Sequence, residues 1–243
     1  MNEIVKKTKD GAILYDKALI DQISDEQFTA SSWLNSEILT GRFGSSGRGN
    51  TFYIGNKPRE YVLRHYNRGG LLSKIVNDSY IFCGEQNTRP FLEWRLLKNL
   101  SMKNMNVPHP VAARFCRYGL FYKADLITIC IPKIISLSEY IAIEERDNKF
   151  WRFVGESIWK FHKVGVNHTD LNAYNIQVNK NGEVWVIDFD KCKIMQPGIW
   201  MQENLNRLYR SLLKIIKLDP KVHFDEEKWK NLKAGYSNAS KSS

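Results

Sequence analysis

An Asn-Gly pair at residues 181–182 separates two short apolar segments, Ile176–Val178 and Val184–Ile187. This arrangement is the strongest short-range signal for a β-hairpin with a two-residue turn. With that turn, Asn175 lies directly across from Asp188, and the two Cβ atoms are about 4.5–5.5 Å apart. An amide oxygen and a carboxylate then meet where the hairpin opens, which is a donor set that Mg²⁺ accepts. The hairpin alone leaves an alternative, in which the asparagine caps a turn and the aspartate is a solvated strand end.

The flanking residues extend this pattern. Residues 168–175 are His-Thr-Asp-Leu-Asn-Ala-Tyr-Asn, and residues 188–190 are Asp-Phe-Asp. An H-x-D-(x)₄-N segment followed 13 residues later by D-F-x has the spacing of a kinase catalytic loop and metal-binding loop. The chain here resembles the protein-kinase-like superfamily. The resemblance implies that Asp170 accepts the proton of the attacking hydroxyl, that Asn175 and Asp188 hold Mg²⁺ on the phosphates of ATP, and that the histidine braces the loop.

A second pair of residues fits the same resemblance. Glu93 lies on one face of a predicted helix, Arg89 to Leu100, together with leucines at i+3, i+4 and i+7. A carboxylate on an apolar face needs a cationic partner. In kinases this glutamate pairs with the strand lysine of V-A-I-K, and the matching segment 61–64 is Tyr-Val-Leu-Arg. The resemblance therefore predicts an Arg64–Glu93 ion pair that positions the ATP phosphates, although arginine and lysine are not interchangeable. A Glu93 that only borders the apolar stripe in solvent is the alternative.

The glycine-rich segment from Gly44 to Gly49 departs from G-x-G-x-x-G, because its spacings run in the opposite order. A glycine-rich turn between strands still offers backbone N–H groups to phosphates, so Gly44 and Gly47 are candidate ATP-binding residues. Asp190 replaces the glycine of D-F-G and leaves open whether it ligates a metal. Only 55 residues follow Asp188, fewer than the helical substrate lobe of a protein kinase needs. Both departures disfavour a protein substrate.

Residues 41–66 and 107–131 show turn and strand patterns, whereas apolar residues after 136 recur at helical steps of 3 and 4, as in residues 151–161 and 205–216. No internal repeat or linker is evident.

These patterns predict two lobes, and the resemblance to kinases implies that they form an α+β, bilobal, protein-kinase-like fold. Residues 1–131 form a strand-rich N-lobe with one key helix and the nucleotide phosphate contacts. Residues 132–243 form a shortened helical C-lobe with the catalytic and metal-binding loops. Residues 237–243 are polar and predict a loose tail.

The net charge of the chain restricts the classes of ligand that it is expected to bind. Lys and Arg number 36 against 26 Asp and Glu, a net charge of +10. A basic surface attracts polyanions without specifying which, so nucleic acid, anionic membrane and a phosphorylated substrate all qualify, as does a protein that is merely basic. No recognised nucleic-acid-binding motif is present, so no nucleic-acid partner is expected. No apolar stretch approaches 18 residues and no signal peptide is visible, so neither a membrane span nor export is expected.

Four segments carry a narrower resemblance: Leu63–Leu71, Arg89–Phe91, His168–Ala173 and Ile187–Cys192. They resemble the lipopolysaccharide core kinases of Gram-negative bacteria over most of the chain, above all those acting on 3-deoxy-D-manno-octulosonic acid (Kdo). The resemblance implies ATP- and Mg²⁺-dependent phosphorylation of a Kdo hydroxyl on a Kdo-bearing lipid A precursor. It also implies a peripheral protein on the anionic surface of the inner membrane, at its cytoplasmic face.

Two other hypotheses remain open on the sequence. One is another small kinase-like phosphotransferase with a heptose, a small alcohol or a protein as acceptor. The other is a basic, non-catalytic binding module, which the complete catalytic set disfavours. The residues do not identify the hydroxyl, the oligomeric state or the acceptor contacts. Arg48, Arg68 and Lys74 are candidates for the acceptor, and each would serve equally well as a solvated surface charge.

Overall fold

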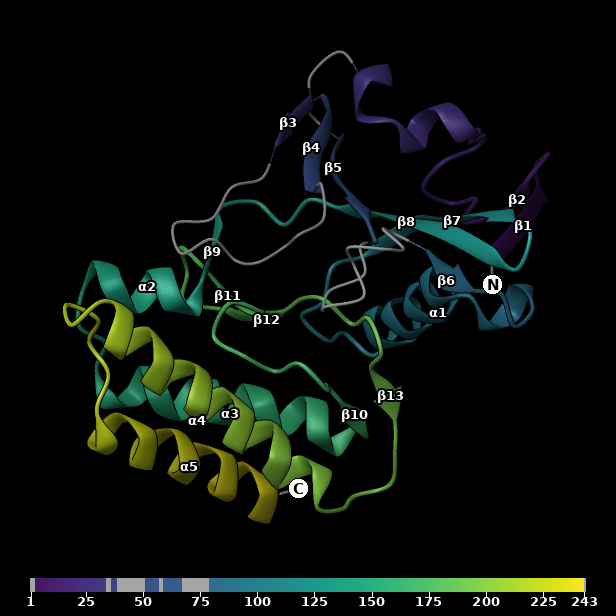
Figure 1. Ribbon diagram of the computed structural model, residues 1–243. Helices are drawn as coiled ribbons and strands as arrows, with labels where there is room; N and C mark the ends of the chain where they lie inside the picture. Colours follow the sequence, from purple (N-terminus) through teal and green to yellow (C-terminus); the bar gives the residue numbers. More distant parts are fainter. Residues whose placement is uncertain (1–2, 34–35, 39–50, 57–58, 67–78, 243) are drawn as a thin grey trace. The chain divides into compact units, whose positions relative to one another are not determined.

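A computed structural model of the protein describes residues 3–33, 36–38, 51–56, 59–66 and 79–242 (Figure 1). The chain divides into two compact units, one made of Met1–Lys103 and Pro108–Ile131, the other of Asn104–Val107 and Pro132–Ser243. The short segment Asn104–Val107 belongs with the second unit because the side chain of Asn106 donates to the carbonyl of Val184 at 3.0 Å and its carbonyl accepts from the N–H of Val186 at 3.1 Å.

An antiparallel sheet forms the first unit, in the order β1-β2-β7-β8-β5-β4-β3, with β6 paired to β8. Its central strand β8 carries β-branched and aromatic residues at both ends, which β-propensity favours. The strands are β1 (Glu3–Lys7), β2 (Gly11–Asp16), β3 (Ser36–Ile38), β4 (Thr51–Asn56), β5 (Arg59–His65), β6 (Tyr80–Ile81), β7 (Pro110–Tyr118) and β8 (Phe121–Ile129). Among the described residues, 3₁₀ turns accompany them at η1 (Asp25–Phe28), η2 (Ala30–Ser32) and η4 (Glu85–Asn87).

Helix α1 (Arg89–Met102) packs against β7 and β8 (Figure 1). Pro90 lies in its first turn, where the missing N–H has no intrahelical partner to lose. Its buried face carries Phe91, Trp94, Leu97 and Leu100, each at most 1% exposed. This is the helix predicted from Arg89 to Leu100, and Glu93 also lies on its buried face.

The second unit is built mainly from helices: α2 (Leu137–Ile143), α3 (Asn148–Lys163), α4 (Trp200–Leu218) and α5 (Glu226–Lys241). Short strands complete it: β9 (Ile134–Ser136), β10 (Val166–Asn167), β11 (Ile176–Asn179), β12 (Val184–Val186) and β13 (Lys193–Ile194). Among them, β11 pairs with both β9 and β12, and β10 pairs with β13. Helices α3 and α4 coincide with the periodic apolar segments of the sequence.

The predicted loose tail from residue 237 is wrong, because α5 continues to Lys241. Helix α5 packs against α3 (Figure 1). A Cβ atom on Gly235 would lie 2.0 Å from the carbonyl oxygen of Arg152, and one on Gly155 would lie 2.0 Å from that of Leu232. The two backbones therefore touch at paired glycines, and this contact supports a helix whose last residues are polar.

The predicted hairpin forms, but its predicted register is wrong by one residue. Strand β11 pairs with β12 so that Ile176 opposes Val186. The loop has three residues instead of two, because Gly182 adopts a left-handed φ of 78° and donates to the carbonyl of Asn179 at 2.9 Å. The Asn179 side chain accepts from the N–H groups of Asn181 at 2.9 Å and Glu183 at 3.0 Å, which favours this longer loop.

The α+β class is confirmed, with a strand-rich first unit that holds helix α1 and a helix-rich second unit. Across the described ranges, no helix combines the length and the apolar character that crossing a membrane requires.

Candidate active site

Asn172 organises the loop between β10 and β11. Its Oδ1 accepts from the N–H groups of Tyr174 at 2.9 Å and Asn175 at 3.1 Å, a local turn that asparagine side chains favour. Its Nδ2 donates to the carbonyl of Asp170 at 3.0 Å, and Nδ2 of Asn175 donates to the same carbonyl at 2.9 Å. The peptide of Asp170 is thus fixed from two sides, whereas its carboxylate is 59% exposed.

His168 joins this loop to the segment after β12. It is 3% exposed, and its Nε2 lies 3.0 Å from the carbonyl of Ile187. Burial lowers the pKa of His168, against the opposing effects of that carbonyl and of the charges on Asp188 and Asp170. The imidazole is therefore neutral near pH 7, and because a carbonyl only accepts, Nε2 carries the proton. His168 braces the loop and lies within electrostatic reach of both carboxylates.

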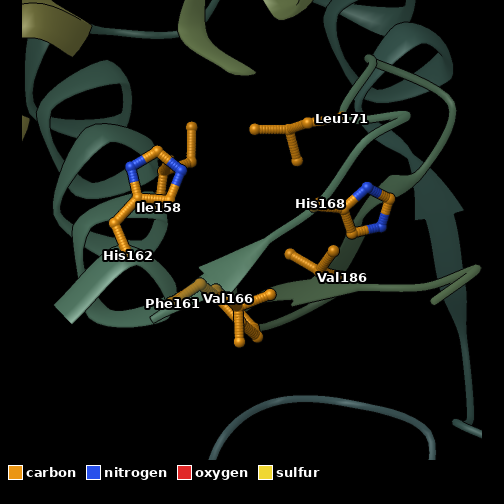
Figure 2. Close-up of a pocket in the computed structure, with 7 residues that line it drawn as sticks. All are labelled: Ile158, Phe161, His162, Val166, His168, Leu171 and Val186. Carbon is orange, nitrogen blue, oxygen red and sulfur yellow. The ribbon is translucent and has the colours of Figure 1, made fainter. Parts of the chain in front are cut away.

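The ring of His168 also faces a small hollow beneath the loop. Phe189 meets the ring edge-on, with 5.2 Å between centroids. In Figure 2, side chains from α3 face those of the loop and the hairpin across this hollow. Its lining is Ile158, Phe161, His162, Val166, His168, Leu171 and Val186. The apolar packing holds the loop from below.

Three polar anchors from distant parts of the chain hold the same loop, and sequence analysis missed them. Ala173 donates to Oγ of Ser211 in α4 at 3.2 Å, and its carbonyl accepts from the N–H of Ser138 in α2 at 3.2 Å. The N–H of His168 donates to Oδ1 of Asn204 at 3.0 Å. Asn204 is 4% exposed and interrupts the otherwise apolar buried face of α4. A polar residue at a core position of an apolar helical repeat needs a hydrogen-bond partner, and this is the sequence signal that could have indicated an anchor.

Asn175 and Asp188 are neighbours at the base of the hairpin, although they are not directly opposed. The carbonyl of Asn175 accepts from the N–H of Ile187 at 2.9 Å, so Asp188 follows the residue that Asn175 faces. Asp188 has a left-handed φ of 63°, a conformation that costs a non-glycine residue on the order of 1 kcal/mol and persists where its surroundings enforce it. The predicted pairing of Asn175 with Asp188 is therefore wrong by one residue, but the two residues still lie next to each other at the base of the hairpin.

This donor set fits a hydrated Mg²⁺ that also binds substrate phosphates. Since Nδ2 of Asn175 is engaged with Asp170, its Oδ1 is the atom left to face a cation. One amide oxygen and one carboxylate, completed by phosphate and water oxygens, is the arrangement that Mg²⁺ prefers. Within the described ranges, no group of three or more His, Cys, Asp or Glu residues could hold a metal ion by itself.

The predicted ion pair of the first unit is present. Nη2 of Arg64 on β5 lies 2.5 Å from Oε2 of Glu93 on α1, and the hydroxyl of Tyr66 donates to the same oxygen. The Glu93 side chain is 3% exposed and that of Arg64 is 22% exposed, which excludes the alternative of a solvated glutamate. The Arg64 guanidinium also lies over the Tyr66 ring, 4.5 Å from its centroid. Sequence analysis did not identify Tyr66.

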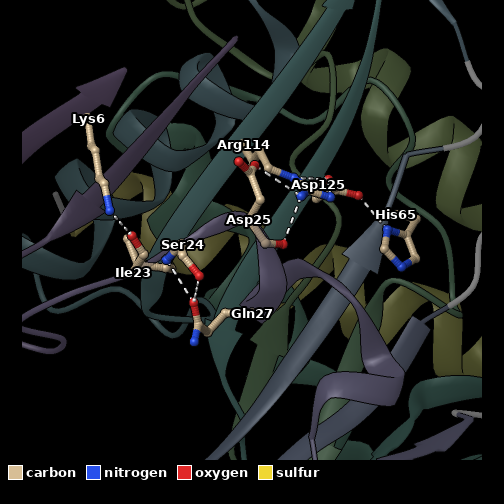
Figure 3. A network of polar contacts seen from close by, with 8 residues as sticks. All are labelled: Lys6, Ile23, Ser24, Asp25, Gln27, His65, Arg114 and Asp125. Atoms are coloured by element: carbon tan, nitrogen blue, oxygen red, sulfur yellow. Dashed lines mark hydrogen bonds and ion pairs between the residues drawn. The ribbon is translucent and has the colours of Figure 1, made fainter. Parts of the chain in front are cut away.

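The next residue of β5 takes part in a second network on the opposite face of the strand. His65 opposes Asp125 of β8 and contacts its Oδ1 (Figure 3). Arg114 of β7 binds Oδ2 of the same carboxylate at 2.7 Å and reaches Asp25 at 3.2 Å. Asp125 is 5% exposed. The buried network therefore links the adjacent strands β5, β8 and β7 next to Arg64.

The remaining candidates lie outside the described residues. Gly44 and Gly47, proposed to contact phosphates, fall in the range 39–50, together with Arg48. Arg68 and Lys74, proposed to contact the acceptor, fall in the range 67–78.

Comparisons with known proteins identify the family of this chain. Residues 40–236 match the profile of the Lipopolysaccharide kinase (Kdo/WaaP) family. A 3-deoxy-D-manno-octulosonic acid kinase of Vibrio parahaemolyticus serotype O3:K6 is 39% identical over 88% of this chain and 89% of its own length. The proteins of the same name in Vibrio cholerae serotype O1 and Stenotrophomonas maltophilia R551-3 are 38% and 39% identical, over 83% and 84% of this chain and 85% and 81% of theirs.

Among solved structures, the kinase PK-1 of Cydia pomonella granulovirus matches 65% of this chain and 52% of its own, with a TM-score of 0.40 and 13% identity. The family profile and the curated relatives confirm the resemblance drawn from the four short segments. The chain belongs to the lipopolysaccharide kinase (Kdo/WaaP) family.

Proposed function

We propose that the protein transfers the γ-phosphoryl group of ATP to a hydroxyl of the Kdo sugar on a Kdo-bearing lipid A precursor. One observation carries the proposal: two asparagines fix the peptide of Asp170 in a loop of kinase spacing, in a member of a lipopolysaccharide kinase family. Relatives at 37–39% identity carry the name 3-deoxy-D-manno-octulosonic acid kinase and align over most of their length, which supports the acceptor.

Asp170 is the proposed general base. Its exposed carboxylate accepts the proton of the sugar hydroxyl as the oxygen attacks phosphorus, and the asparagine bonds to its carbonyl keep the side chain in place. Asn175 and Asp188 would hold Mg²⁺, which when bound neutralises charge on the ATP phosphates. Arg64, held by Glu93, would contact those phosphates from the first unit, as would Gly44 and Gly47.

The proposed location is the cytoplasmic face of the inner membrane, as a peripheral protein on its anionic surface. The net charge of +10 supports this, because clustered basic residues bind anionic lipid headgroups. No nucleic-acid partner is proposed.

One assay tests the proposal. The protein is incubated with Mg-ATP and, in parallel, the Kdo-bearing precursor, the same lipid without Kdo, a heptose-bearing lipid and a generic protein, and the products are measured by mass spectrometry. Addition of one phosphate to the Kdo-bearing lipid alone is expected. Phosphate on the heptose, on the Kdo-free lipid or on the protein would instead identify a different phosphotransferase. No phosphate transfer to any of them would contradict the proposal.

A further inference from the structure

The exposed face of α4 carries a continuous basic stripe. Its members are exposed and recur at i, i+3, i+7 and i+10, so they lie on one side of the helix. They are Arg207, Arg210, Lys214 and Lys217. The opposite side of α4 is buried, through Leu205, Leu208, Leu212 and Ile215. The four cations therefore point to solvent along about 15 Å of helix.

Little negative charge offsets the stripe. No acidic residue occurs in α4 after Glu203, and the next in the chain is Asp219. Within the described residues, the one ion pair recorded for the four is between Nη1 of Arg207 and Oδ1 of Asp170, at 3.6 Å. By contrast, Lys228 of α5 binds Glu145 at 2.7 Å and Asp225 at 2.8 Å. Like charges at i+3 and i+4 of a helix repel one another, and a bound anion would relieve that repulsion.

The position of the stripe points to the acceptor side of the reaction. One end of it touches Asp170, the proposed base, and the other reaches the last turn of α4. Two exposed leucines flank it, Leu213 at 37% and Leu218 at 64% exposure. A ligand that is both polyanionic and lipidic matches this combination, because arginine and lysine bind phosphate oxygens and the leucines tolerate acyl chains.

We infer that the stripe on α4 binds the phosphate groups of the acceptor glycolipid and so delivers its sugar hydroxyl to Asp170. This inference rests on the proposed function, since it assigns the surface that the acceptor occupies. The occupant is the phosphorylated acceptor itself and not the bulk membrane surface.

The test replaces three cations and spares Arg207, which contacts the proposed base. The variant Arg210→Gln/Lys214→Gln/Lys217→Gln is compared with Lys230→Gln/Lys233→Gln/Lys241→Gln, which removes the same charge from exposed positions of α5. Assays in neutral detergent micelles use the Kdo-bearing lipid A precursor and the same lipid after enzymatic removal of its phosphates. We expect the α4 variant to raise KM for the phosphorylated lipid about tenfold or more, with KM for ATP and KM for the dephosphorylated lipid within about twofold of wild type. The α5 variant should match wild type throughout.

Three results would overturn the inference. An equal rise in KM for the dephosphorylated lipid would show that phosphate is not recognised. An equal rise in KM for the α5 variant would show that the effect depends on net charge and not on the position of the stripe. Unchanged KM in micelles, with lost sedimentation on phosphatidylglycerol vesicles, would make the stripe a membrane contact.

A binding measurement without ATP separates this inference from the proposed function. If the wild type phosphorylates no Kdo-bearing lipid, the proposed function fails. The Kd of the α4 variant for the phosphorylated lipid, divided by that of the α5 variant, still tests whether the stripe binds the phosphate groups. A ratio of about ten or more supports it, and a ratio near one overturns it.

Discussion

Asp170 combines a fixed backbone with an exposed carboxylate, so the side chain can be changed without disturbing the loop. Asp170→Asn keeps the size and the hydrogen-bonding capacity toward the hydroxyl but removes the proton acceptor. We expect nucleotide affinity within a few-fold of wild type and a turnover number lower by at least about 10²-fold. Steady-state kinetics on the Kdo-bearing lipid measure this, with the exposed Asp21→Asn as the matched control. Turnover near the wild-type rate would remove Asp170 from the chemistry.

The backbone of Asp188 adopts a left-handed conformation, which asparagine tolerates better than alanine does. Asp188→Asn therefore tests the charge rather than the backbone. We expect turnover to be abolished and nucleotide affinity to lose its dependence on Mg²⁺, because the carboxylate is the charged member of the donor pair. Titration of nucleotide with and without Mg²⁺ measures the effect. A variant that keeps the wild-type Mg²⁺ dependence contradicts the assignment.

The Arg64–Glu93 pair is a matter of stability as well as of catalysis, because Glu93 is buried. Arg64→Met removes a cation that contacts this carboxylate, and we expect the free energy of unfolding to fall by about 3–5 kcal/mol. The double variant Arg64→Met/Glu93→Met removes the buried carboxylate as well and should recover part of the loss. Urea denaturation of both variants measures the difference. A double variant less stable than the single one would show that the charge is not what costs stability.

At the scale of elements, α3 and α5 meet at glycines where an added methyl group has no room. Gly→Ala within a helix normally stabilises by about 1 kcal/mol. Gly235→Ala reverses that sign here, because its Cβ would lie 2.0 Å from the carbonyl oxygen of Arg152. We expect a lower melting temperature for Gly235→Ala and an equal or higher one for Ser237→Ala, an exposed position of the same helix. A stabilised Gly235→Ala protein would mean that the helices do not touch there.

The same contact explains what sequence patterns could and could not predict. The helices α3 and α4 were predictable because their apolar residues repeat with the period of the buried face. The end of α5 was not, since residues 237–241 are polar and their helical state depends on packing against α3. The hairpin was predictable from Asn181 and Gly182, but its register depended on hydrogen bonds to the side chain of Asn179.

The site shows a similar division. Asp170, Asn175 and Asp188 were proposed from short, fixed spacings along one segment. The structure places Asp170 and Asn175 in one loop and Asp188 at the base of the hairpin beside Asn175, and their chemical roles stay predictions. The apolar helical face indicated that Glu93 needs a cationic partner, and the resemblance to kinases indicated that Arg64 is that partner. The anchors Ser138 and Ser211 were not predictable, because they approach the loop through tertiary structure and obey no local spacing.

At the scale of the whole molecule, stability depends on pH through a buried histidine where three helices meet. His162 of α3 lies with its Nδ1 2.8 Å from the hydroxyl of Tyr236 in α5, and its ring meets Trp200 of α4 edge-on at 5.1 Å. It is 1% exposed. Burial lowers the pKa of His162 to about 4, against an opposing effect of Asn204. The folded protein therefore holds this imidazole neutral.

The sign follows from proton binding. Between pH 6.5 and pH 4 the unfolded chain binds more protons at His162 than the folded one, so the free energy of unfolding falls as pH falls through that window. From pH 7 to pH 5 the loss is about 2 kcal/mol from this residue, and His168, whose pKa burial also lowers, adds to it with the same sign.

Urea denaturation of wild type, His162→Gln and the exposed control His223→Gln at both pH values measures the loss. The His162 variant should lose less stability between pH 7 and pH 5 than the other two proteins, whatever its stability at pH 7. Equal losses in all three proteins would place the pH dependence elsewhere in the molecule.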